Sequence, residues 1–186
     1  MNTRRVIFVD PEIWTTRPSK ENHMNNPEGP TPRDVRMAAA LIIHHRGGNS
    51  EGLAEIVRET IETDRAAQLL EGLLDLHRVY IVQTRTPVGI QYLGTYVGQL
   101  AEVDDRSELT LDMQRAARVL DCHGRDDVDG INEVLTETRA DNRGAQLLQA
   151  LLDLYDAVLP EILSEPGRRW LDACIASLIK QEEGGQ

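Results

Sequence analysis

The stretch RAAQLLEGLLDL, residues 65–76, returns 78 residues later as RGAQLLQALLDL, residues 143–154. Nine of the twelve positions are identical, and the two stretches align without a gap. Their leucines recur at helical spacing and cover one broad apolar face. The stretch therefore predicts one buried helix in each of two similar parts of the chain.

The similarity extends beyond this helix at the same offset of 78 residues. Residues 38–60 align with residues 116–138 with seven identities, and Gly89 and Leu93 align with Gly167 and Leu171. One offset that holds without an insertion indicates a tandem duplication. Two copies are too few for a solenoid, which needs several stacked units. We therefore expect two units that pack face to face about a pseudo-two-fold axis.

The composition favours an all-α fold. Aromatic residues make up only 4% of the chain, whereas sheets need many β-branched and aromatic side chains. Apolar periodicity together with Pro, Gly and capping residues predicts four helices in each unit. The expected ranges are 32–45, 52–61, 65–83 and 87–101 in the first unit, and 110–123, 128–139, 142–159 and 166–180 in the second.

These helices divide the chain into four parts: an N-terminal strand and extended arm at 1–32, a first helical unit at 33–102, an acidic linker at 103–109, and a second unit with a short C-terminal tail at 110–186. The sequence RRVIFVD, residues 4–10, predicts the strand. A lone strand needs a partner for its backbone groups. Phe8 and Trp14 are the apolar anchors of the arm. They either dock on the protein's own helices or reach another chain.

Several polar residues occur in both units at the offset of 78. Arg65 and Gln68 recur as Arg143 and Gln146. One interpretation is structural: each arginine pairs with a glutamate of the preceding helix, and each glutamine satisfies nearby backbone groups. The other interpretation is a symmetric pair of binding sites, which requires these side chains to converge on a cavity.

Two histidines at the end of the first helix of each unit, His45 and His123, are the remaining candidates for a binding site. Their neighbours His44 and Cys122 point about 100° away on a helix, so adjacent side chains cannot share one metal. Cys122 is either a reactive thiol beside His123 or an inert core cysteine. No metal or phosphate-binding motif accompanies these residues. The sequence therefore predicts no metal, no cofactor and no catalytic residue.

The charge of the chain restricts its partners. A formal net charge of −11 disfavours direct nucleic-acid binding, which requires a basic surface. The acidic surface also fits a nucleic-acid mimic that occupies a basic cleft on another protein. No apolar run has membrane length, and two cysteines do not form a disulfide framework, so we expect a cytoplasmic protein. The chain has 18 Arg and 2 Lys, which is typical of GC-rich genomes such as those of actinobacteria and their phages.

Two hypotheses of function follow. The first is a non-enzymatic interaction protein, an adaptor, assembly factor or inhibitor, which binds a protein partner through its N-terminal arm and allows a homodimer. The second is a small-molecule-binding or hydrolytic protein with a site between the two units, lined by His45, His123 and neighbouring carboxylates. It requires a pocket on the pseudo-two-fold axis and a strongly shifted pKa there.

Overall fold

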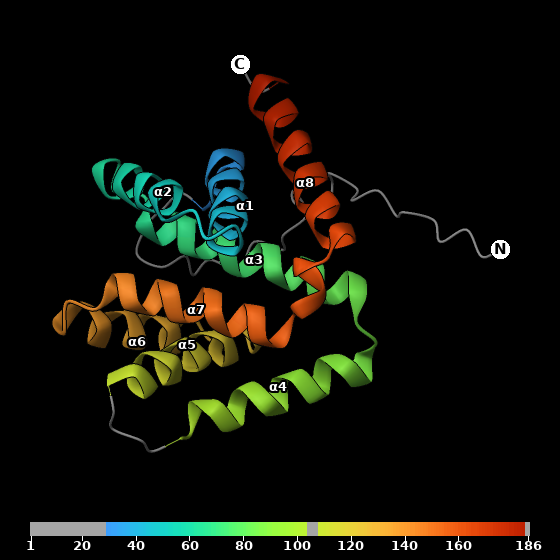
Figure 1. Cartoon of the computed structure of the whole chain (residues 1–186). Coiled ribbons are helices and arrows are strands. Elements are labelled where there is room, and N and C mark those ends of the chain that lie inside the picture. Colours follow the sequence, from blue (N-terminus) through green and yellow to red (C-terminus); the bar gives the residue numbers. More distant parts are fainter. Residues whose placement is uncertain (1–28, 104–107, 185–186) are drawn as a thin grey trace.

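The described part of the chain is all-helical, as predicted. The computed structural model describes residues 29–103 and 108–184, and within these ranges it contains eight α-helices, one 3-10 helix and no strand (Figure 1). The α-helices are α1 (Pro32–Arg46), α2 (Ser50–Glu62), α3 (Ala66–Thr84), α4 (Pro87–Ala101), α5 (Glu108–Gly124), α6 (Val128–Ala140), α7 (Gly144–Val158) and α8 (Glu165–Gly184), and the 3-10 helix is η2 (Pro160–Leu163). The expected strand, together with Phe8 and Trp14, lies outside the described residues.

Local capping chemistry starts the first helix where the sequence predicts. The Thr31 hydroxyl accepts a hydrogen bond from the Asp34 amide, and the Asp34 carboxylate accepts one from the Thr31 amide. This capping box satisfies two backbone donors that the first turn leaves unpaired. Pro32 follows the cap at the first helical position, where its missing N–H costs nothing.

Three other helix ends differ from the sequence expectation. Asn49 caps α2 by accepting from the Gly52 amide, in place of Ser50. No side chain caps α3, which begins after Asp64 in the left-handed conformation at φ 53°. Helix α8 continues to Gly184, four residues beyond the expected end, and Arg36 Nε donates to Glu182 Oε1 at 2.8 Å there. This tertiary ion pair helps to hold the last turn, which the sequence pattern alone does not support.

Residues 78 positions apart, which we call register pairs, adopt matching backbone conformations at two turns. Asp64 and Asn142 have φ 53° and 55°, and Gly48 and Asp126 have φ 63° and 56°. A left-handed residue is uncommon outside glycine, although Asn and Asp tolerate it better than other side chains. The turns between α1 and α2 and between α5 and α6 therefore follow the same path.

The last helix of each half packs on the first helix of the other half. We call α1 to α4 the first half and α5 to α8 the second half. Helix α1 packs against α2, α3 and α8, and α5 packs against α6, α7 and α4. Figure 1 shows α8 beside α1 at one end of the molecule and α4 beside α5 at the other. The two halves thus complete each other's cores.

The core is centred on small residues in α1 and α5 and on leucines in α3 and α7. Ala38, Ala39, Ala116 and Ala117 are fully buried. The leucines of the repeated stretch surround them, with Leu73, Leu74, Leu76, Leu151, Leu152 and Leu154 all buried. The predicted central role of these two helices is therefore confirmed. Within the described residues no helix is both long enough and apolar enough to cross a membrane.

Helices α3 and α7 differ in length. Helix α3 runs to Thr84, whereas α7 ends at Val158, which pairs in register with Tyr80. Pro160 follows, and a proline cannot donate the next helical hydrogen bond. The chain turns into η2 instead, and α7 lacks the last turn that α3 has.

Candidate functional site

The two histidines singled out by the sequence lie at the contact between the halves. His45 Nε2 lies 3.3 Å from Asp153 Oδ1 on α7, and His123 Nε2 lies 3.4 Å from Asp75 Oδ1 on α3. Both the histidines and the aspartates are register pairs, so the same contact occurs twice across the junction. His45 also lies 3.3 Å from Asp156 Oδ2. The predicted neighbouring carboxylates are present, and they belong to the opposite half in each case.

Between these contacts, one register pair stacks on itself. The rings of His77 on α3 and Tyr155 on α7 lie with centroids 3.5 Å apart and an interplanar angle of 7°. His77 is fully buried, and its Nδ1 lies 2.8 Å from the Leu73 carbonyl oxygen. Burial and the nearby Arg46 guanidinium lower the pKa of His77 to about 3. The ring is therefore neutral, and with Nδ1 donating to the carbonyl it fixes the relative position of α3 and α7.

The arginines of the repeated stretch form buried ion pairs. Arg65 Nε donates to Asp34 Oδ1 at 2.8 Å, and Arg143 Nε donates to Asp112 Oδ1 at 2.9 Å. Burial opposes ionisation of Asp34, but hydrogen bonds from Arg65 and Thr31 outweigh it and lower its pKa. The hydrogen bond from Arg143 likewise lowers the pKa of Asp112. The expected partner, a glutamate of the preceding helix, was wrong: the partner is an aspartate at the start of the first helix of the same half.

The two glutamines of the repeated stretch have different surroundings. Gln68 is buried, whereas Gln146 is exposed. Of the six predicted residues that the structure describes, Arg143 and Gln146 line one hollow between α5 and α7, with Asp112, Gln149 and Asp153 on the same surface. His45 approaches this surface through Asp153. Arg65, Gln68 and His123 lie elsewhere, so the predicted residues do not converge on one cavity.

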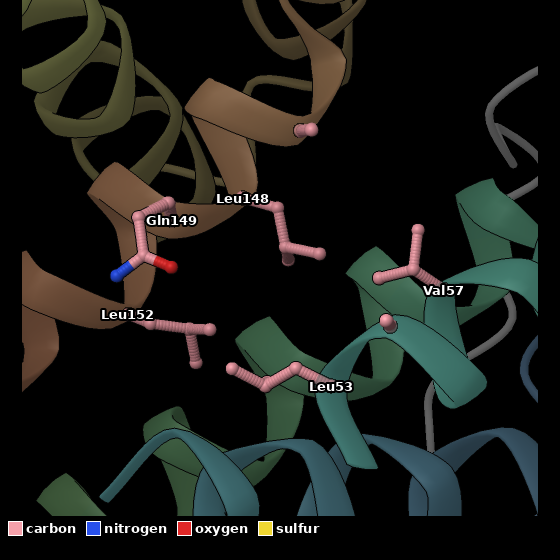
Figure 2. A pocket seen from close by; sticks show the side chains of 7 residues that line it. Leu53, Val57, Leu148, Gln149 and Leu152 are labelled. Atoms are coloured by element: carbon pink, nitrogen blue, oxygen red, sulfur yellow. The ribbon is translucent and has the colours of Figure 1, made fainter. Parts of the chain in front are cut away.

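An apolar groove opens beside this hollow, between α2 and α7. Figure 2 shows Leu53 and Val57 of α2 facing Leu148 and Leu152 of α7 across it. Ala54 and Ala145 are also in its lining, and Gln149 belongs to both the groove and the hollow. The groove has a volume of about 240 Å³ and the hollow about 360 Å³.

The register partners of the groove residues form a closed surface. Leu53 and Leu148 are half-buried in the groove, whereas their partners Ile131 and Leu70 are only 4% and 8% exposed. Leu74, the partner of Leu152, is fully buried. Two arrangements of the same helices therefore differ in one respect: the surface between α2 and α7 is open.

Both walls of the groove are acidic. Helix α2 carries four glutamates and one arginine, and α7 carries two aspartates and no basic residue. Arg58 is already paired with Glu55 on the same helix. The surroundings of the apolar lining therefore favour a positively charged partner.

The two cysteines are not suited to nucleophilic chemistry. Burial raises the pKa of Cys122, and it raises the pKa of Cys174 to about 12. Both thiols therefore stay protonated near neutral pH, and the thiolate is the reactive form. Of the two interpretations of Cys122, the inert core cysteine fits these surroundings. In the described ranges no group of three His, Cys, Asp or Glu side chains is arranged to hold a metal ion.

Comparison of the chain with protein-family models, with curated protein sequences and with solved structures finds no match. The function is therefore argued from the geometry of the chain itself.

Sequence reasoning missed the groove residues and the stacked pair. The groove lies between the halves, so no local pattern marks Leu53, Val57 or Leu148 as different from core positions. A signal did exist for His77 and Tyr155. They directly follow the repeated stretch and are the first residues after it that differ.

We expect the substitution His77→Phe to reduce the acid sensitivity of folding. His77 stays neutral in the folded protein to about pH 3, whereas an unfolded histidine takes up a proton near pH 6.5. Protonation therefore favours the unfolded state below pH 6.5. Between pH 6.5 and 5 this coupling costs the wild type about 2 kcal/mol of unfolding free energy that the phenylalanine variant keeps. Urea unfolding at several pH values measures the difference, and parallel pH profiles would show that the folded protein protonates His77.

We expect Arg65→Met and Arg143→Met to lower the unfolding free energy by similar amounts, about 2 kcal/mol each at pH 7, because each leaves a buried aspartate without its charged donor. The exposed pair Arg58–Glu55 provides the control, and Arg58→Met should cost less than about 0.5 kcal/mol. Pairing lowers the pKa of Asp34 and Asp112, so its stabilisation is present above about pH 4 and is lost as they protonate. Chemical unfolding at pH 7 and pH 3 should show the cost shrinking in acid.

Proposed function

We propose that the chain is a non-enzymatic interaction protein, an adaptor, assembly factor or inhibitor, that binds a basic amphipathic helix of a protein partner in the groove between α2 and α7. The observation that carries this proposal is the open apolar groove, where the register-related surface is closed. An exposed apolar channel in a core of this kind costs free energy unless a partner covers it.

The shape of the groove favours a helix as its occupant. Two helices form its walls, and the four large lining residues, two from each wall, leave a channel between them. Helix α2 has 13 residues and is thus about 20 Å long, which matches three to four turns of a bound helix. Helix-in-groove recognition uses an apolar stripe of this length.

The charge of the groove favours lysine and arginine beside that stripe. The walls have net charges of −3 on α2 and −2 on α7, by the count of their ionisable residues. Glu51 and Glu55 are exposed on α2, and Asp153 is exposed on α7. Basic side chains that flank an apolar stripe would reach these carboxylates. Such attraction mainly speeds association and excludes acidic competitors.

The volume of the groove disfavours the small-molecule hypothesis. About 240 Å³ is below the 300–1,000 Å³ typical of small-molecule sites. The larger hollow of about 360 Å³ is lined by Arg143 and Asp112, which already pair with each other, and no histidine or cysteine lines it. His45 and His123 lie beside carboxylates at the junction without lining either space. The binding hypothesis therefore has the better support.

We also propose that the scaffold is a tandem duplication with a pseudo-two-fold axis between His77 and Tyr155. Its support is the set of register pairs with equal roles: the Asp–Arg pairs of α1–α3 and α5–α7, the His–Asp contacts between halves, and the matching left-handed turns. A cytoplasmic location remains part of the proposal, since the two cysteines are separate and unbridged. The N-terminal arm with Phe8 and Trp14 stays a predicted second contact to partners.

The groove can be tested with a designed peptide of about 18 residues, with leucines on one helical face and lysines on the others. We expect fluorescence anisotropy to show saturable binding to the full chain that weakens as salt is added. The double variant Ala54→Gln/Ala145→Gln should weaken binding at least tenfold, because both alanines are exposed in the groove and the added side chains fill it without disturbing the core.

The matched control is Ala66→Gln/Ala140→Gln, which makes the same change at two exposed alanines outside the groove. This control should bind within about twofold of the wild type. A peptide with the same composition but a scrambled order should bind weakly. Equal affinity for both double variants, or no peptide binding by the wild type at about 100 μM, would contradict the groove as a helix site.

A further inference from the structure

Helix α4 stands apart from the other helices because it has no charge. Its sequence, PVGIQYLGTYVGQLA, contains no Asp, Glu, Lys or Arg, and each of the other described α-helices contains at least two. Charged residues make up 27% of the whole chain. An outer helix that faced only water would carry charge on its exposed side.

The exposed side of α4 is instead apolar and aromatic. Leu93, Val97 and Leu100 belong to the core or pack against it. Val88, Tyr92 and Tyr96 are 74%, 75% and 42% exposed, and they recur every four residues along one stripe. Figure 1 shows α4 on the outside of the molecule, beneath α5.

Comparison with α8 explains why this stripe is uncovered. The register partners of Tyr92 and Tyr96 are Trp170 and Cys174, which are half-buried and buried. Trp170 packs edge-on against Tyr80 with centroids 4.9 Å apart, and its Nε1 donates to Gln83 Oε1 at 2.9 Å.

Tyr80 and Gln83 belong to the end of α3, and α7 has no such final turn because it stops at Val158. The early end of α7 therefore removes the cover that α4 would otherwise have.

We propose that a second copy of this chain covers the stripe, with two α4 helices packed antiparallel about a two-fold axis near Tyr92. The charge of the molecule selects this occupant. Each copy carries −11, so two copies repel wherever their acidic surfaces meet, and only α4 lets them touch without burying a charge. The stripe is also self-complementary: Val88 and Tyr96 lie equally far from Tyr92, so in an antiparallel pair each valine faces a tyrosine of the other copy.

The size of the stripe predicts a weak dimer. Helix α4 is roughly 22 Å long, and each tyrosine can bury up to about 200 Å². The stripe thus covers on the order of 500 Å² per copy, below the roughly 800 Å² of a standard interface. We expect a dissociation constant of roughly 10 μM or weaker and a dimer that exchanges readily.

Sedimentation equilibrium of the full chain between about 1 and 300 μM tests this proposal. The average mass should rise from 20.8 kDa toward twice that value. Tyr92→Glu should weaken association at least tenfold and leave folding intact, because the side chain is exposed. Ile61→Glu introduces the same charge at an apolar position that is 67% exposed on α2, and it should leave the dissociation constant within about twofold of the wild type.

Phe8→Asp in the full chain separates this dimer from one formed by the N-terminal arm. If Phe8→Asp abolishes association and Tyr92→Glu does not, the arm forms the dimer and the proposal is wrong. A wild type that stays at 20.8 kDa up to 300 μM also overturns it. Equal losses from Tyr92→Glu and Ile61→Glu would mean that added charge, and not the stripe, controls association.

Discussion

The fold depends on the two alanine pairs at the centre of α1 and α5. Ala38 and Ala39, and Ala116 and Ala117, are fully buried, and each pair sits in a helix that three others surround. A helix can have close neighbours on three sides only if its side chains are small there. Larger residues would push at least one neighbour away. Because one of those three neighbours comes from the opposite half, the alanines also set how the halves fit together.

The helices could be predicted because their signals are local. The limits of α4 are those expected, since Thr86 and Pro87 mark its start through contacts within one turn. The beginning of α3 could not be fixed, because Asp64 in a left-handed turn continues the same polar pattern as a cap. The last turn of α8 was also missed, since its partner Arg36 is 146 residues away. Periodicity identifies a helix, whereas tertiary contacts decide its final residues.

The candidate site was harder to predict than the helices. The register offset correctly marked Arg65 and Arg143 as equivalent, but their partners Asp34 and Asp112 lie two helices back and require the tertiary fold. His77 and Tyr155 illustrate a related limit. At a two-fold axis a residue meets its own equivalent, so two identical side chains must suit each other there. A histidine opposite a tyrosine escapes that restriction, and such a divergence in the repeat is easily mistaken for drift.

The exchange of final helices has a consequence for synthesis on the ribosome. Helix α1 emerges among the first helices, yet α8, which covers it, is the last to be made. At roughly 5–20 residues per second, α1 waits on the order of ten seconds with part of its apolar face uncovered. The first helix of the second half has no such delay, since α4 precedes α5. A chain interrupted before α8 therefore exposes α1 to chaperones and proteases, and the cell can recognise an unfinished product by its first helix.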